Sequence, residues 1–216
     1  MTRSLNVLSG VLLVALNVAG CGARGGASTE PATMSGPVVA TPGARAPDFT
    51  ASDIDGHRIT LSGHFGKDVV LLDFCSTWCE PCVAEFPHLR SLYEANKDKG
   101  FVILAISVDG PETMANVPGF ARRNRLAFPM LIDGDERISA LYNPRRTAPV
   151  TVLIDRTGMV VAIREGYTAG DEHSIAKAVE MALETPPARP LTGSGARGLN
   201  RRRAVDAILS LPGDDG

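Results

Sequence analysis

Cys79 and Cys82 lie two residues apart in the stretch STWCEPC, directly after an apolar run at residues 69–74. An amphipathic pattern follows over residues 85–96, so the pair falls where a buried strand meets a helix. A C-x-x-C motif at such a joint is typical of a redox-active dithiol. The free amide groups and positive dipole of a helix N-terminus favour a thiolate at the first cysteine. The motif therefore predicts Cys79 as the nucleophile and Cys82, one helical turn later, as the resolving cysteine.

Metal binding is the alternative chemistry for a C-x-x-C motif. A structural zinc site needs four ligands, and the sequence has no second cysteine pair and no Cys/His pair near the motif. A copper-binding module stays open, although methionines are scattered as core residues are, rather than clustered as ligands. We therefore expect no metal and no cofactor other than the Cys79–Cys82 disulfide itself. The four histidines also show no ligand spacing: His57, His64, His88 and His173.

The elements that must position the cysteines form an α/β pattern. Apolar, β-branched runs predict strands, and three-to-four spacing of apolar residues predicts helices. A turn at residues 155–158 joins the last two strands as a hairpin, and a second hairpin is predicted around residues 55–56. The expected fold is a central mixed β-sheet flanked by helices, with an N-terminal β-hairpin. The predicted strands are 69–74, 101–108, 150–154 and 159–163, and the predicted helices are 85–96 and 174–183.

The composition limits the size of the domain and the kinds of partner. The chain has 216 residues, of which 44% are hydrophobic and 21% charged, which is enough for one core with tails. Its formal net charge of -2 argues against nucleic acid as a partner. Pro-, Gly- and Arg-rich sequence near the end predicts a packed domain at residues 46–184 and a low-complexity tail at 185–216.

The N-terminal segment has the outline of an export signal. Residues 1–20 combine an early arginine, an apolar stretch and small residues at its end, and polar residues interrupt it too often for a membrane span. Val18-Ala19-Gly20-Cys21 resembles the lipobox of bacterial lipoproteins, which predicts lipidation of Cys21. Residues 21–45 would then be a flexible tether. We expect a lipid-anchored protein of the bacterial cell envelope, facing the periplasm or extracytoplasmic space; the other interpretation is a plain secreted protein.

Three stretches together resemble one family: VVLLDFCSTWCEPCVAEFP, APDFTASDIDGHRITLSGHFGK upstream of it, and FPMLIDGDERISALYNPRRTAPVTVLIDRTGMVVAIREGY downstream. In content and order they resemble the TlpA- and ResA-like thiol-disulfide oxidoreductases of the thioredoxin superfamily, which are related to the AhpC/TSA and Redoxin group. The resemblance implies a thioredoxin-like fold with a central insert, here at residues 111–129. It also implies thiol-disulfide exchange through the two cysteines.

The resemblance assigns further residues to the site. It implies a cis peptide bond before Pro149, whose backbone would bind the substrate strand beside the cysteines. Ala148 departs from the threonine that relatives often carry there. Trp78 is expected to cover Cys79 and to shape the partner surface, although packing alone also explains a tryptophan at this position.

Three acids complete the expected site. Asp73 aligns with a buried aspartate of classical thioredoxins that assists proton transfer at the resolving cysteine; the alternative is an aspartate held by hydrogen bonds at a strand end. Glu80 would destabilise the neighbouring Cys79 thiolate and favour electron donation, or serve only as a first-turn acid. Glu85 matches a family acid near the site, with a role in proton transfer or none. Cys75 is expected to be a small buried residue that points away from Cys79.

The expected function is a disulfide reductase for exported proteins, with cytochrome c maturation as one family role. Its expected partners are disulfide-bearing exported proteins and a membrane electron donor. A peroxiredoxin-like peroxidase is the alternative enzyme. Such peroxidases need a threonine three residues before the reactive cysteine, where this chain has Ser76.

Overall fold

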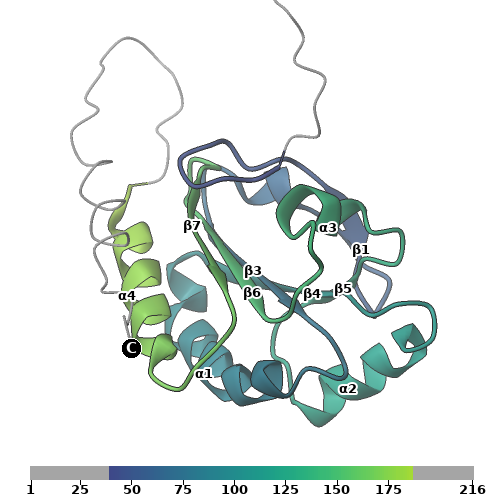
Figure 1. The fold of residues 1–216 in the computed structure, drawn as a ribbon. Helices are drawn as coiled ribbons and strands as arrows, with labels where there is room; N and C mark the ends of the chain where they lie inside the picture. The colour runs from purple at the N-terminus through teal and green to yellow at the C-terminus, as the bar shows by residue number, and fades with distance from the viewer. Residues whose placement is uncertain (1–38, 187–216) are drawn as a thin grey trace, which may run out of the picture. The chain divides into compact units, whose positions relative to one another are not determined.

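The computed structural model describes residues 39–186, which form a five-stranded mixed sheet with helices on both faces. The strand order is β5-β4-β3-β6-β7 (Figure 1). β3 pairs in parallel with β4 and antiparallel with β6, β4 pairs in parallel with β5, and β6 pairs antiparallel with β7. This confirms the predicted α/β class and mixed sheet. The strands are β3 (Val69–Cys75), β4 (Phe101–Ser107), β5 (Met130–Ile132), β6 (Val150–Ile154) and β7 (Val160–Glu165).

Successive side chains of β3 point to opposite faces of the sheet, so the hydrophobic core has two halves, one on each face. Every residue of β3 is buried, as expected for a central strand with both faces covered. Val69, Leu71 and Cys75 pack on one face, and Val70, Leu72 and Phe74 pack on the other. Asp73 shares the face of Leu71 and Cys75, which places a carboxyl group in the first half of the core.

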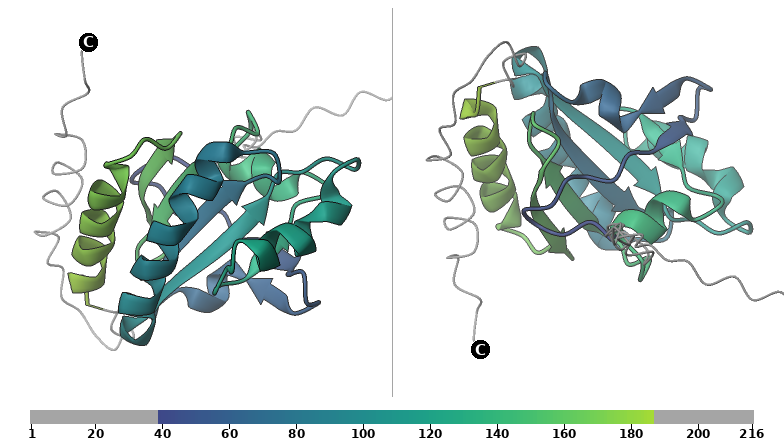
Figure 2. Two further views of the ribbon diagram at one scale, coloured as in Figure 1. Left: turned by 90° about the horizontal axis from the view of Figure 1, so that it is seen from below. Right: turned by 90° about the horizontal axis from the view of Figure 1, so that it is seen from above.

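Helices α1 (Glu80–Asn96), α2 (Val117–Arg123) and α4 (Asp171–Glu184) cover that first face (Figure 2, left). Helix α3 (Arg137–Tyr142) packs on the opposite face. The sequence predicted α1 and α4 but began each several residues late, because their polar first turns carry little apolar periodicity. It did not predict β5, α2 or α3, which are too short to show a period. Short 3-10 turns also occur in the described part of the chain: η1 (Leu61–His64), η2 (Lys97–Lys99) and η3 (Met114–Asn116).

Both predicted hairpins are present. β1 (Thr50–Ser52) pairs antiparallel with β2 (Arg58–Thr60), in shorter strands than the sequence indicated. In the β6–β7 turn, Asp155 Oδ1 accepts hydrogen bonds from the amides of Thr157 and Met159, and Gly158 has a φ of 79°. That left-handed conformation is one that glycine adopts readily.

The N-terminal edge of the packed region lies earlier than the predicted boundary at residue 46. The amide of Ala40 donates to the carbonyl of Leu141, and the amide of Gly43 donates to the carbonyl of Val160. Residues 40–45, assigned from sequence to a flexible tether, are therefore partly anchored on α3 and β7. The expected signal segment, Cys21 and most of the C-terminal tail lie outside the described residues. Within residues 39–186, no helix combines the length and apolar character needed to cross a membrane.

Candidate redox site

The two cysteines lie at the start of α1 and form a disulfide. Residues 76–79, here called the redox loop, connect the end of β3 to the helix. Cys79 is the N-cap residue, and its sulfur accepts a hydrogen bond of 3.2 Å from the amide of Cys82. Pro81 occupies the first turn, where no intrahelical partner exists for an amide hydrogen. After reduction, the same amide and helix end favour negative charge on the Cys79 sulfur.

The surroundings of the disulfide distinguish the two sulfurs. Cys79 keeps 3% of its surface exposed and Cys82 none. Trp78 is 62% exposed and Val83 43%, so a mostly apolar rim flanks Cys79. Trp78 thus extends into solvent beside the disulfide.

Pro149 follows a cis peptide bond from Ala148 and directly precedes β6. Because Phe74 of β3 pairs with Val150 of β6, Pro149 lies beside the end of β3, where the redox loop begins. The carbonyl of Pro149 accepts the amide of Gly166 at 2.8 Å. The sheet thereby brings the predicted proline next to the redox loop, although Cys79 and Pro149 are 70 positions apart in the sequence.

Asp73 lies in the middle of β3, fully buried, opposite Ala105 and Thr151. Within the described residues neither carboxyl oxygen has a hydrogen-bond partner. This contradicts the alternative of an aspartate held by hydrogen bonds at a strand end. Loss of hydration disfavours the charged form, so burial raises the pKa of Asp73 to about 7.

Glu85 is a buried residue of α1 and is 2% exposed. Burial raises its pKa to about 9, and the charges of Asp73 and Asp171 act in the same direction, while Arg164 opposes them. Arg164 and Asp171 form an ion pair across β7 and α4. Glu85 lies three residues after Cys82 on α1, so both side chains share one side of the helix. Two buried carboxyl groups with raised pKa values, those of Asp73 and Glu85, therefore lie in the core near the start of α1.

The structure also places the remaining predicted residues. Glu80 is the first residue of α1 and is exposed, with its carboxylate next in sequence to Cys79. Cys75 is fully buried and, among the described cysteines, it alone lies outside the disulfide. The expectation that Cys75 points away from Cys79 is wrong: it packs in the same buried cluster as Cys79 and Cys82, because strand alternation turns it toward α1. Burial raises the pKa of the Cys75 thiol. Nearby negative charges raise it further, those of Asp73, Asp109 and Glu85.

Cys75→Ala is expected to leave thiol-disulfide exchange intact, because a buried thiol with a raised pKa is a poor nucleophile. The loss of packing should lower the free energy of unfolding by about 1 kcal/mol. Chemical denaturation together with disulfide-exchange rates checks both effects. A large loss of exchange in a folded Cys75→Ala variant would show that this thiol takes part in the reaction.

Another polar group lies away from the redox loop, on the β1–β2 hairpin. Asp53, Asp55 and His57 place potential ligand atoms within 4.8 Å of one another. Asp53 Oδ1 already accepts the amides of Asp55 at 2.9 Å and His57 at 2.8 Å, so this group organises the turn. In the described part of the chain, it is the single cluster with such spacing, and neither Cys79 nor Cys82 belongs to it.

Sequence reasoning missed Arg164, Asp171 and Asp109, all of which influence buried acids or the thiol of the site. Asp109 had a detectable signal, since it follows the end of a long buried strand that is parallel to β3. Polar residues after such strand ends collect at one edge of the sheet. Arg164 and Asp171 gave no such signal, because only the packing of α1, β7 and α4 brings them near Glu85.

A mixed sheet with a disulfide at the start of its first long helix and a neighbouring cis-proline defines a thioredoxin-like thiol-disulfide oxidoreductase. Comparison with known proteins agrees. The model of the AhpC/TSA family matches residues 42–163. The chain belongs to this family, and within it to the TlpA- and ResA-like thiol-disulfide oxidoreductases.

Relatives and solved structures support this assignment. The chain is 41% identical to the thiol-disulfide oxidoreductase ResA of Geobacillus kaustophilus over 124 residues, which cover 57% of this chain and 69% of the relative. It is 34% identical to ResA of Bacillus subtilis over 164 residues, covering 76% of this chain and 86% of that one. A crystal structure from Chlorobium tepidum, assigned as a thiol:disulfide interchange protein DsbE, superposes with a TM-score of 0.61 at 28% identity. That match covers 67% of this chain and 99% of the other.

Proposed function

We propose that this protein is a membrane-tethered disulfide reductase that acts on exported proteins. The observation that carries the proposal is the Cys79–Cys82 disulfide at the start of α1, backed by the buried carboxyl groups of Asp73 and Glu85. The first feature supplies the exchanging sulfurs. The second supplies proton exchange and an environment that disfavours thiolates.

The proposed reaction has two exchange steps. In the reduced protein, the Cys79 thiolate attacks one sulfur of the substrate disulfide, and the other substrate sulfur leaves as a thiolate that takes up a proton. The Cys82 thiol then loses its proton to a carboxylate behind it, and the new thiolate attacks the Cys79 sulfur. The Cys79–Cys82 disulfide closes, and the second substrate sulfur leaves as a thiolate that takes the proton from that carboxyl group. Two electrons and two protons have moved to the substrate, and the structure describes the oxidised end of this cycle.

Asp73 suits the proton-transfer role because a group with a pKa near 7 can accept and return a proton at neutral pH. Glu85, with a pKa of about 9, would hold a proton at the same pH. A proton lost by Cys82 would then pass to Asp73 rather than be released into an apolar core. No cofactor is required, because the dithiol itself carries both electrons.

The acids also support the direction of electron flow. Negative charge near Cys79 or Cys82 destabilises a thiolate, and this makes the reduced form a better electron donor. Glu80 contributes from the surface, and Asp73 contributes from the core to the extent that it is ionised. The oxidised protein must then be reduced again, which in our proposal is done by a membrane dithiol donor.

The substrates that we propose are disulfides in exported proteins, with the C-x-x-C pairs of cytochromes c as one class. The exposed rim at Trp78 and Val83 supports a polypeptide substrate rather than a small molecule. A peroxidase function has less support, since the matching relatives are thiol-disulfide oxidoreductases.

The proposal is tested by incubating the reduced protein with insulin, whose disulfides are accessible, and the oxidised protein with a reduced, unfolded cysteine-containing protein. A reductase transfers electrons rapidly in the first assay and forms disulfides slowly in the second. Faster disulfide formation than disulfide reduction would contradict the proposed direction.

The lipid anchor is a separate prediction. Replacing Cys21 with alanine in the full chain should move the protein from the membrane fraction to the soluble fraction and abolish the incorporation of labelled fatty acid, because a single thiol carries the anchor. Cys75→Ala serves as the control, since that thiol is buried. Membrane association that survives Cys21→Ala would contradict the anchor.

A further inference from the structure

Two segments that flank the disulfide are connected by a chain of polar contacts. One is the redox loop, residues 76–79. The other is residues 143–148, here called the cis-proline loop, which connects α3 to Pro149. Both lie near the C-terminal end of β4, where β4 runs parallel to β3.

Asp109 anchors the redox loop to this end of β4. It is 1% exposed, and its Oδ2 accepts the amide of Thr77 at 2.9 Å and the hydroxyl of Ser107 at 2.9 Å. Its Oδ1 accepts the hydroxyl of Thr77 at 2.6 Å. Burial alone would raise the pKa of Asp109, but hydrogen bonds from Thr113, Thr77 and Ser107 lower it below its ordinary value. An ionised carboxylate thus accepts two bonds from the residue that precedes Trp78.

Arg146 anchors the cis-proline loop to the same place. Its Nη2 donates to the carbonyl of Val108 at 2.7 Å, and its Nη1 forms an ion pair with Glu136. Asn143 closes the loop internally: its Oδ1 accepts the amide of Thr147 at 3.1 Å, and its Nδ2 donates to the Thr147 carbonyl at 2.7 Å. The loop is therefore a fixed unit that one guanidinium group attaches to β4.

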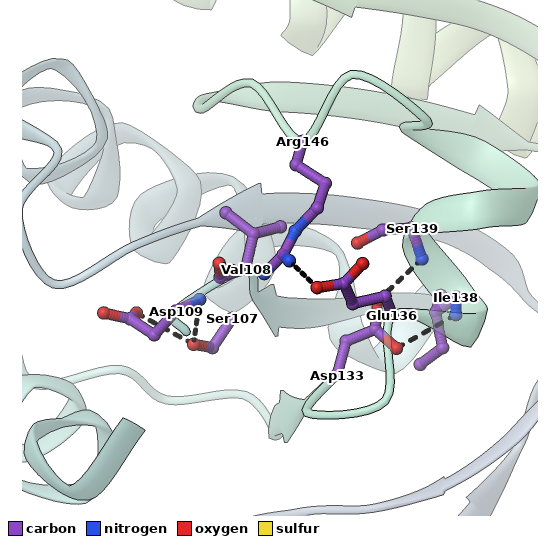
Figure 3. A network of polar contacts seen from close by, with 8 residues as sticks. All are labelled: Ser107, Val108, Asp109, Asp133, Glu136, Ile138, Ser139 and Arg146. Carbon is purple, nitrogen blue, oxygen red and sulfur yellow. Dashed lines mark hydrogen bonds and ion pairs between the residues drawn. The ribbon is translucent and has the colours of Figure 1, made fainter. Parts of the chain in front are cut away.

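The two anchors meet within three consecutive residues. Figure 3 shows Arg146 reaching toward Val108, with Ser107 and Asp109 on either side of it in sequence. The amide of Val108 also donates to the carbonyl of Cys75 at 2.9 Å, which attaches the same segment to the end of β3. The segment 107–109 thus contacts the redox loop, the cis-proline loop and the strand between them.

We propose that Asp109 and Arg146 are positioning residues that hold the redox loop and the cis-proline loop at a fixed separation, and so determine how a protein disulfide fits between them. This inference rests on the proposed function, in which a polypeptide substrate lies along the backbone near Pro149 while its disulfide meets Cys79. A polypeptide must contact both loops at once. A small disulfide needs only Cys79, and its reaction is therefore insensitive to the separation.

The test compares Arg146→Gln and Asp109→Asn with a matched control, Arg145→Gln. Arg145 is the neighbouring arginine in the same loop, but its side chain pairs with Glu165 on β7, at the surface and away from segment 107–109. We expect Arg146→Gln and Asp109→Asn to raise KM for insulin about 10-fold, because small misplacements of binding groups reduce productive encounters strongly. The rate with oxidised glutathione should change less than about two-fold for every variant.

A second readout does not depend on the substrate. Trp78 is the sole tryptophan of the chain, so its fluorescence reports on the redox loop alone. Arg146→Gln should increase the quenching of Trp78 by acrylamide and lower its anisotropy, whereas Arg145→Gln should change neither. An effect confined to local folding of the cis-proline loop would not reach Trp78.

The outcomes separate the two proposals. If Arg146→Gln matches Arg145→Gln in both insulin KM and Trp78 fluorescence, the positioning role is wrong. Equal losses with insulin and oxidised glutathione would also overturn it, since these indicate general damage. If the wild-type protein fails to reduce insulin while Arg146→Gln still loosens Trp78, the proposed function fails and the positional link between the two loops stands.

Discussion

Replacing Cys82 with serine is expected to convert the protein into a trap that holds its substrates through a stable mixed disulfide. Cys79 would still attack, because its nucleophilicity depends on the start of α1 and not on the sulfur of Cys82. Release needs the second thiol, so resolution should slow by several orders of magnitude, on the order of 10³-fold or more. Non-reducing gels of envelope extracts, followed by mass spectrometry, would show adducts that reducing agent removes.

The matched control is Cys79→Ser, which keeps the other cysteine. Cys82 has no exposed surface, so this variant should form almost no adducts and should have almost no insulin-reducing activity. Comparing the two variants therefore distinguishes the nucleophile from the resolving cysteine, which neither variant does alone. Adducts that form through Cys82 in Cys79→Ser, at the level seen in Cys82→Ser, would reverse the assignment of nucleophile and resolving cysteine.

Replacing Asp73 with asparagine is expected to stabilise the oxidised protein at alkaline pH. The pKa of Asp73 rises from 3.8 to about 7 on folding, so between these values the folded protein binds more protons than the unfolded chain. Stability then falls as pH rises through this window. Asparagine removes that fall. We expect a gain in the free energy of unfolding on the order of 4 kcal/mol at pH 8, because each pH step across the window costs about 1.4 kcal/mol.

The sign of this effect has an internal control. The pKa of Asp109 is lowered, so its charged form stabilises the fold above the unfolded pKa, and Asp109→Asn should destabilise the protein at pH 8. Below about pH 4, Asp73→Asn and the wild-type protein should have nearly equal free energies of unfolding. The Asp73 carboxyl group is then largely protonated, so it is neutral like the asparagine amide that replaces it. Urea denaturation at pH 4 and pH 8 measures all of these differences. A loss of stability at pH 8 in Asp73→Asn would show that the carboxylate is satisfied in the fold.

The same variant should slow the resolving step near neutral pH, because asparagine cannot accept a proton from Cys82. The rate of mixed-disulfide resolution should then depend on pH as an unassisted thiol does, with higher rates only at alkaline pH. Glu85→Gln provides the comparison. Since Glu85 has a pKa of about 9, its replacement should change the rate mainly at alkaline pH.

The sequence predicted the long elements and the redox motif well, because these depend on local patterns. The largely apolar run at residues 69–74 indicated a buried central strand, and the C-x-x-C motif directly after it indicated the start of a helix. It did not predict β5 or α3, because three to six residues show no period. Cys75 was placed on the wrong side because the alternation of β3 continues to its last residue, so Cys75 shares a face with Asp73.

The contacts that organise the site depend on distant segments. Asp109 and Arg146 are separated by 36 residues, and only the order of β4, β3 and β6 brings their partners together. Likewise, Glu85 meets Arg164 and Asp171 through the packing of α1, β7 and α4. Such neighbours follow from strand order and helix packing, which a single sequence does not specify residue by residue.

The most direct measurement of the central claim is the reduction potential of the Cys79–Cys82 couple, by equilibration with dithiothreitol or glutathione buffers and thiol trapping. Our account predicts a value near or below that of thioredoxin, about −270 mV, with Glu80→Gln shifted toward less negative values because a charge that disfavours the Cys79 thiolate is gone. A value near the roughly −120 mV of a strong oxidant would identify a disulfide donor and contradict the proposed reductase.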